Sequence, residues 1–216
     1  MLAQVIVYYL LLFIIMINGM VCFKKLTIPF KLLTLLVTFT LLLEITARIC
    51  ALMYKNNIAV MHIMGLTEYI LFSLTFYYLF KSKIVKASIL VSIVIISIFF
   101  FINALLLQPY NRVFPSNIVL PSEIAYTIFS LLLFKQMLQY PLQINIIKQS
   151  IFWYNTAILF FSTTMFLNLG LINYYIKHRL NDGIIHDFTL GINVIFYVLI
   201  GISILMNSKE ITFDNG

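Results

Sequence analysis

The chain has 216 residues, of which 62% are apolar and only 10% are charged, and its formal net charge at pH 7 is +7. Soluble domains are typically about half apolar and about one quarter charged. The composition therefore excludes a soluble globular enzyme, a disordered chain and a disulfide-stapled secreted module, and it predicts an all-α polytopic protein of the inner (plasma) membrane, with the lipid bilayer as its first partner.

The positive charge does not indicate a nucleic-acid partner. The 14 lysines and arginines lie mainly in short stretches between apolar runs, where membrane orientation and lipid headgroups explain them. No basic cluster is interleaved with aromatic residues. Cys22 and Cys50 are expected near opposite faces of the bilayer, so a disulfide between them is excluded by geometry.

Seven stretches are long enough to cross a bilayer, which takes about 20 predominantly apolar residues. They predict a bundle of seven transmembrane helices joined by short loops and followed by a short cytoplasmic tail at residues 207–216. The predicted spans, in chain order, are residues 2–23, 30–53, 58–80, 84–107, 118–138, 151–172 and 184–206.

The basic residues predict an outside N-terminus and a cytoplasmic C-terminus, because cytoplasmic loops carry an excess of lysine and arginine. With seven spans, nine basic residues fall on one side: Lys24, Lys25, Lys31, Lys81, Lys83, Lys86, Lys135, Lys148 and Lys209. Five fall on the other side: Arg48, Lys55, Arg112, Lys177 and Arg179.

The second span contains Glu44 and Arg48, which the i,i+4 spacing places on one helix face. Ionisable residues at membrane depth are costly, so each one suggests a functional site. A structural salt bridge that joins this helix to its neighbours explains the pair equally well.

The third span contains His62 and Glu68. Glu68 lies ten residues in from Ile58, which at about 1.5 Å per residue places it near the bilayer midplane. It is either a ligand-binding carboxylate or a protonated side chain bonded to a neighbouring helix. His62 is shallower and points about 120° away from Glu68.

Three further candidates lie at predicted span starts. Glu123 follows Pro121 at the start of the fifth span, and His186 and Asp187 open the seventh. Glu123 and Asp187 could simply complement a helix N-terminus. All the candidates fall in the outer half of the bilayer, which predicts a water-accessible pocket opening outward: Glu44, Arg48, His62, Glu68, Glu123, His186 and Asp187.

The sequence lacks the residues that several known activities and cofactors require. The seventh span has no lysine for a retinal Schiff base, and no H-E-x-x-H, paired C-x-x-C, phosphate-binding glycine loop or G-x-S-x-G motif occurs. No cofactor, metal ligand set or catalytic residue is therefore assigned, although a zinc site formed by Glu68 with His62, His178 or His186 stays an open alternative.

The chain resembles a loose group of small bacterial seven-helix membrane proteins. The resemblance rests on E-x-x-x-R in the second span, on Asn57, His62, Glu68 and Tyr69 at the spacing N-x4-H-x5-E-Y, on P-S-E at 121–123 and on F-W-Y-N at 152–155. It implies an architecture and no activity. At the level of the fold alone, the chain also looks like the membrane portion of seven-helix sensory proteins.

The leading hypothesis is a protein that binds or senses a small polar or amphiphilic ligand, with output through a partner membrane or cytoplasmic protein. Glu68 and the Glu44–Arg48 pair would contact the ligand, and the other four candidates would line the entrance. A non-catalytic structural subunit of a membrane complex is one alternative. Another is an intramembrane hydrolase or transferase acting on lipid, with Glu68 as general acid/base and a histidine assisting.

Overall fold

In the computed structural model, which describes residues 2–141, 145–178 and 183–214, the chain is all-α. Three short helical turns lie between the long helices: η1 (Phe23–Lys25), the π-helical η2 (Asn103–Leu107) and η3 (Ile146–Lys148). The described residues form seven long helices: α1 (Leu2–Cys22), α2 (Ile28–Tyr54), α3 (Ile58–Leu79), α4 (Lys83–Ile102), α5 (Ser116–Gln139), α6 (Ser150–His178) and α7 (Gly183–Asp214).

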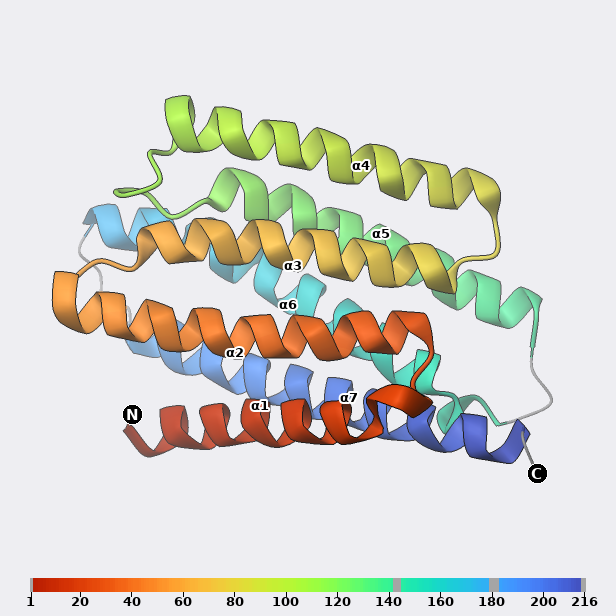
Figure 1. Ribbon diagram of the computed structural model, residues 1–216. Helices are drawn as coiled ribbons and strands as arrows, with labels where there is room; N and C mark the ends of the chain where they lie inside the picture. Colours follow the sequence, from red (N-terminus) through yellow and green to blue (C-terminus); the bar gives the residue numbers. More distant parts are fainter. Residues whose placement is uncertain (1, 142–144, 179–182, 215–216) are drawn as a thin grey trace.

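The helices run up and down side by side, so the two termini lie at opposite ends of the bundle (Figure 1). The end that carries the N-terminus, called the N-terminal end below, also carries the α2–α3 turn and the α4–α5 loop. The α1–α2 and α3–α4 turns and the α5–α6 connection lie at the C-terminal end. Helix α6 packs on α5 and α7, α1 packs on α2 and α7, and α4 packs at the edge, mainly on α3.

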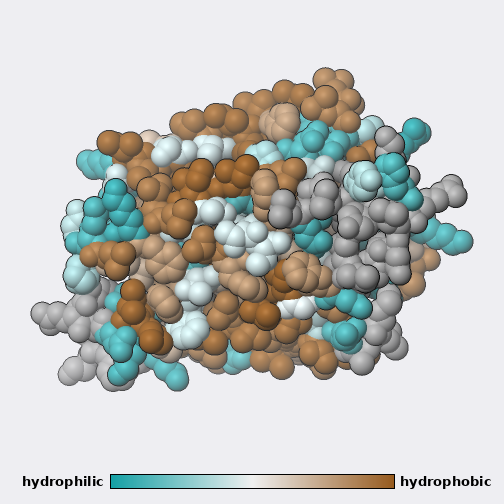
Figure 2. Space-filling view, turned by 180° about the vertical axis from the view of Figure 1, so that it is seen from behind, coloured by the Kyte–Doolittle hydropathy of each residue, from teal (hydrophilic) through white to brown (hydrophobic). Residues whose placement is uncertain are grey.

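Six of the described helices are long and apolar enough to cross a membrane, namely α1 to α5 and α7. Large aliphatic and aromatic side chains remain exposed on their outer faces, among them Val94, Ile98 and Phe101 of α4. Figure 2 shows apolar side chains over the middle of one face of the molecule and hydrophilic ones mainly toward its ends. Lipid would cover such a surface, and helices suit it because they satisfy their own backbone hydrogen bonds. A membrane crossing by α6 remains a prediction.

Two helices extend well past their predicted ends, and one predicted span contains a proline. Helix α5 begins at Ser116, two residues before the predicted 118, and contains Pro121. Pro121 is the sixth residue of this helix, beyond the first turn, so its missing N–H leaves the carbonyl of Asn117 without its i→i−4 hydrogen bond. Helix α6 continues to His178, and α7 continues to Asp214, so most of the predicted tail at 207–216 is helical.

A polar network closes the C-terminal end. The Glu210 carboxylate of α7 accepts hydrogen bonds of 2.6 Å from both the backbone N–H and the hydroxyl of Ser150, the first residue of α6. Asn207 donates to Glu210 at 3.2 Å and accepts from the backbone N–H of Thr27 at 3.0 Å. Glu210 thereby supplies an acceptor and a negative charge to the start of α6.

Candidate functional site

A cavity of about 520 Å³ lies between six of the helices, with side chains contributed by α1, α2, α3, α5, α6 and α7. Its lining includes Arg48, Asn57 and Thr189 toward the N-terminal end, and it reaches Phe72 and Tyr126 further along α3 and α5. Phe72 is 14 residues into α3, or about 21 Å along its axis. The cavity therefore extends from the N-terminal half of the bundle past the middle of α3.

Three carboxylates from three helices line this cavity: Glu44 of α2, Glu68 of α3 and Glu123 of α5. Glu44 accepts a hydrogen bond from the hydroxyl of Tyr8 at 3.3 Å, and Glu68 accepts one from the hydroxyl of Thr40 at 3.4 Å. Glu68 lies within electrostatic reach of both other glutamates. The structure thus gathers four of the seven predicted site residues around one cavity, since Arg48 also lines it.

Glu123 has the least support from its protein neighbours. Its side chain is only 5% exposed, and its Oε2 atom is buried with no hydrogen-bond partner. Because α5 starts at Ser116, Glu123 lies about two turns inside the helix. It therefore does not complement the free N–H groups of the first turn, and the helix-terminus explanation from the sequence is wrong.

Arg48 contributes the positive charge of the cavity wall, but it does not form the ion pair with Glu44 that the spacing allows. Glu44 bonds across to α1 through Tyr8, whereas Arg48 is exposed. Among the described residues no ion pair within 4.0 Å joins the two. A long guanidinium side chain keeps its hydration by reaching toward water, and Arg48 lies one turn nearer the N-terminal end than Glu44.

The other three predicted site residues are not brought to the cavity wall. His62 is buried, with 2% of its side chain exposed, and its Nε2–H donates to the backbone carbonyl of Val113 at 2.9 Å. It holds the α4–α5 loop to α3 and does not line the cavity. Asp187 is exposed and is also absent from the lining. The side chain of His186 lies outside the described residues.

Aromatic side chains form a contiguous wall of the cavity. Tyr8 and Tyr197 have ring centroids 5.9 Å apart, and Tyr197 lies 4.9 Å from Phe196. Phe196 lies 5.9 Å from Phe72, which is 5.6 Å from Tyr126. Five rings from α1, α7, α3 and α5 therefore follow one another at distances typical of aromatic packing.

The sequence offered no clear sign of this wall, because aromatic residues within apolar runs look like ordinary core. One usable signal was spacing. Phe72 follows Glu68 by four residues and Tyr126 follows Glu123 by three, so each ring lies on the same helix face as a carboxylate, one turn further in. This spacing places an aromatic ring one helical turn deeper in the bundle than each of the two carboxylates.

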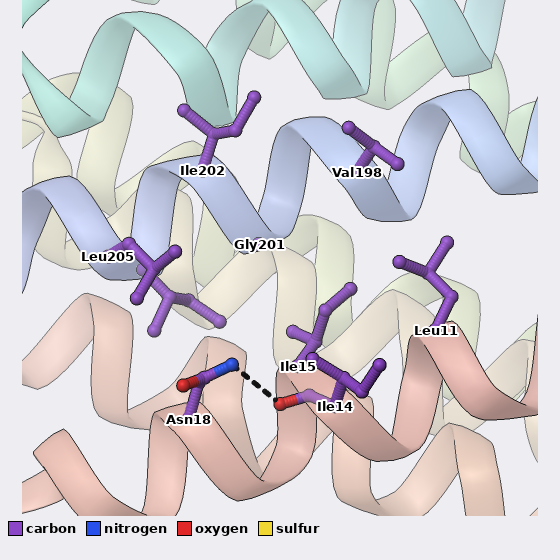
Figure 3. Close-up of a pocket in the computed structure, with 9 residues that line it drawn as sticks. Leu11, Ile14, Ile15, Asn18, Val198, Gly201, Ile202 and Leu205 are labelled. Carbon is purple, nitrogen blue, oxygen red and sulfur yellow. Dashed lines mark hydrogen bonds between the residues drawn. The ribbon is translucent and has the colours of Figure 1, made fainter.

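A second, smaller hollow of about 190 Å³ lies between α1 and α7 (Figure 3). Aliphatic side chains line nearly all of it, and the amide of Asn18 donates to the carbonyl of Ile14 in its own helix at 3.0 Å. Asn18 is its one polar side chain, and no acidic or aromatic residue belongs to the lining. The larger cavity is therefore the candidate site.

No ion ligand set is evident in this arrangement. Among the described residues, no group of three or more histidine, cysteine, aspartate or glutamate side chains is placed to hold a metal ion. The three glutamates surround a shared space without converging on one point. An organic molecule would fit between them better than a coordinated metal.

Comparison of the chain with protein families, with curated protein sequences and with solved structures gave no match.

Proposed function

We propose that the protein binds a small amphiphilic ligand in the cavity between its helices and transmits the bound state to a partner membrane or cytoplasmic protein. The observation that carries this proposal is the cavity itself, about 520 Å³ in volume and lined by both acidic and aromatic side chains. Ligand sites typically occupy about 300–1,000 Å³ and combine an apolar lining with a few polar groups.

The proposed orientation follows from the charge on the connecting segments. Lys24, Lys25, Lys81 and Lys83 lie in or beside turns at the C-terminal end of the bundle. By the positive-inside rule this end faces the cytoplasm of a plasma membrane. The cavity, with the exposed Arg48 in its lining toward the N-terminal end, then lies mainly in the outer half of the protein and receives its ligand from outside or from the outer leaflet.

The size of the cavity favours ligand binding over a purely structural role. Protein interiors are closely packed, and an empty space lowers stability in proportion to its volume. A subunit whose polar groups served only helix packing would gain by closing around Glu123, whose Oε2 atom has no partner. A binding site requires this space.

The lipid hydrolase alternative has less support. It needs a histidine beside Glu68, whereas His62 bonds to the carbonyl of Val113 outside the cavity lining. His178, at the C-terminal end of α6, is exposed and packs against Tyr174. No described contact joins either imidazole to Glu68.

Filling the cavity tests the proposal. A Cβ atom added at Gly65 meets no atom within 4 Å, and Gly65 lines the cavity, so Gly65→Leu should occupy the space with little strain. Gly191→Leu is the matched control, because Gly191 is equally uncrowded but is exposed on α7 and does not line the cavity.

The probes are three eight-carbon amphiphiles below their critical micelle concentrations: octyltrimethylammonium, octyl glucoside and octyl sulfate. At least one should raise the thermal unfolding midpoint of the protein in phosphatidylglycerol nanodiscs, by roughly 3 °C at ten times its dissociation constant. Gly65→Leu should lose this shift and Gly191→Leu should keep it. If no probe shifts the midpoint, or if both variants respond alike, cavity binding is wrong.

A further inference from the structure

We propose that the ligand of this cavity carries an organic ammonium group, held among Glu44, Glu68 and Glu123 and against the aromatic wall. This inference rests on the proposed function, because it identifies the chemical class of the molecule that the cavity binds.

The balance of charge around the cavity is the first argument. Three carboxylates line the cavity, but Arg48 is exposed and forms no ion pair with Glu44 among the described residues. Carboxylates withdrawn from water are unfavourable as anions unless a cation accompanies them. A positively charged ligand would supply that missing charge.

The unpartnered atom is the second, independent argument. Buried polar atoms in proteins almost always have a hydrogen-bond partner, so an exception calls for an explanation. Glu123 is about nineteen-twentieths buried, lines the cavity, and has no partner for Oε2. A ligand N–H group would satisfy this acceptor, and a quaternary ammonium would still neutralise its charge.

The aromatic wall is the third argument and selects an organic cation over a metal ion. Cations are attracted to the faces of tyrosine and phenylalanine rings within about 6 Å, and quaternary ammonium groups are commonly recognised in this way. Phe72 and Tyr126 lie one turn beyond Glu68 and Glu123, and both rings line the cavity. The described acids do not form a metal site.

The apolar part of the lining accommodates the rest of the ligand. Met61, Met64 and Ile118 line the cavity together with the acidic groups. An alkyl or aryl chain packed there would add hydrophobic stabilisation in proportion to the apolar area that it buries. The chemistry is therefore an ammonium head with an apolar body, which either a free amphiphile or a lipid headgroup could provide.

The decisive experiment compares the same three eight-carbon probes by calorimetry on the full chain in phosphatidylglycerol nanodiscs. Octyltrimethylammonium should bind about tenfold or more tightly than octyl glucoside, and octyl sulfate most weakly. Glu123→Gln and Glu68→Gln should each raise the dissociation constant of the cation about tenfold, since each keeps the side-chain shape and removes one negative charge.

Of two further variants, one should strengthen binding of the cation and the other should leave it unchanged. Arg48→Gln should tighten binding of the cation, because it removes a like charge from the wall of the cavity. Asp187→Asn removes one negative charge, as Glu123→Gln does, but Asp187 is exposed and lies outside the cavity lining. This variant should leave the dissociation constant of the cation unchanged. If Glu123→Gln fails to fold, Glu68→Gln carries the test.

The outcomes separate this inference from the proposed function. If octyl glucoside or octyl sulfate binds best and Gly65→Leu abolishes that binding, the cavity binds ligand but the ammonium assignment is wrong. The assignment is also wrong if Glu123→Gln and Glu68→Gln bind the cation as tightly as the unmodified protein, or if Asp187→Asn weakens binding as much as they do. If no probe binds, the proposed function fails as well.

A final arm distinguishes the two sources of the ammonium group. Nanodiscs containing phosphatidylcholine should weaken binding of added octyltrimethylammonium by competition if a lipid headgroup enters the cavity. If a free amphiphile is the natural ligand, the dissociation constant should be the same with and without phosphatidylcholine. Both results support recognition of an ammonium group, provided that the glutamine variants lose binding.

Discussion

The hydroxyl of Tyr8 on α1 donates a hydrogen bond to Oε1 of Glu44 on α2 across 3.3 Å, joining residues 36 positions apart in the chain. Glu44 makes this contact although Arg48 is its neighbour one turn along the same helix. The contact ties α1 to the acidic side of the cavity, and both residues belong to its lining.

Double-mutant cycles should therefore couple Glu44 to Tyr8 and not to Arg48. Tyr8→Phe and Glu44→Gln should show a coupling free energy of about 0.5–3 kcal/mol, as residues in direct contact do. Glu44→Gln and Arg48→Gln should couple by less than about 0.5 kcal/mol, because an exposed guanidinium is screened by water. The measurement is the free energy of unfolding in detergent, and a larger coupling in the second cycle would contradict this assignment.

Gly19→Ala should destabilise the protein by about 1–3 kcal/mol through overpacking. A Cβ atom at Gly19 would lie 2.6 Å from Cγ2 and 2.7 Å from Oγ1 of Thr34 on α2. Thr34 is buried and its hydroxyl donates to the carbonyl of Phe30 at 2.9 Å, so it has little room to move.

The control for this substitution is Gly191→Ala, where the added Cβ atom meets nothing within 4 Å. It should be neutral or stabilising by up to about 1 kcal/mol, because alanine has the higher helix propensity. Equal unfolding free energies for the two variants would show that α1 and α2 do not approach closely at Gly19.

Glu210→Gln should destabilise the C-terminal end of the bundle by about 1–3 kcal/mol. The amide provides one acceptor for Ser150, where the carboxylate provides two at 2.6 Å, and it loses the charge that favours a helix N-terminus. Amide hydrogen exchange should accelerate at the start of α6. Thr163→Ala is the control, since this exposed hydroxyl donates only within α6. A faster exchange in both variants would argue against a specific contact.

His62→Leu should loosen the α4–α5 loop, which also contributes Phe114 to the cavity lining. The change leaves the carbonyl of Val113 without its 2.9 Å hydrogen bond, so limited proteolysis near Asn111 should become faster. Because Phe114 of this loop lines the cavity and His62 does not, any weakening of ligand binding should accompany the loss of loop protection. Loss of binding with normal loop protection would restore His62 as a site residue.

The orientation predicts the accessibility of two positions. A reporter fused after Gly216 should report the cytoplasm, and a tag inserted at Asn111, an exposed residue of the α4–α5 loop, should react from outside the cell. A tag at Asn111 that reacts only after the membrane is permeabilised would reverse the orientation and turn the N-terminal end of the bundle toward the cytoplasm.

Hydropathy along the chain was enough to predict the all-α fold and most helix positions, because the length and apolarity of a local segment decide whether it suits a bilayer. The predicted third span at 58–80 corresponds to α3 at Ile58–Leu79. The predicted ends were too early for α6, which continues to His178, and for α7, which continues to Asp214. Polar side chains beyond Met206 remain helical because Asn207 and Glu210 find partners on α6 and on Thr27.

Which side chains line the cavity, by contrast, depends on how each helix is rotated about its own axis. The apolar residues of α3 and α5 are spread over all faces of each helix. No polar stripe in the sequence therefore indicates which face turns inward. Packing alone directs Glu68 and Glu123 to one space, aligns rings from four helices beside them, and turns His62 away toward Val113. These contacts join residues far apart in the chain, and side-chain shape and hydrogen bonding select them only once the helices are assembled.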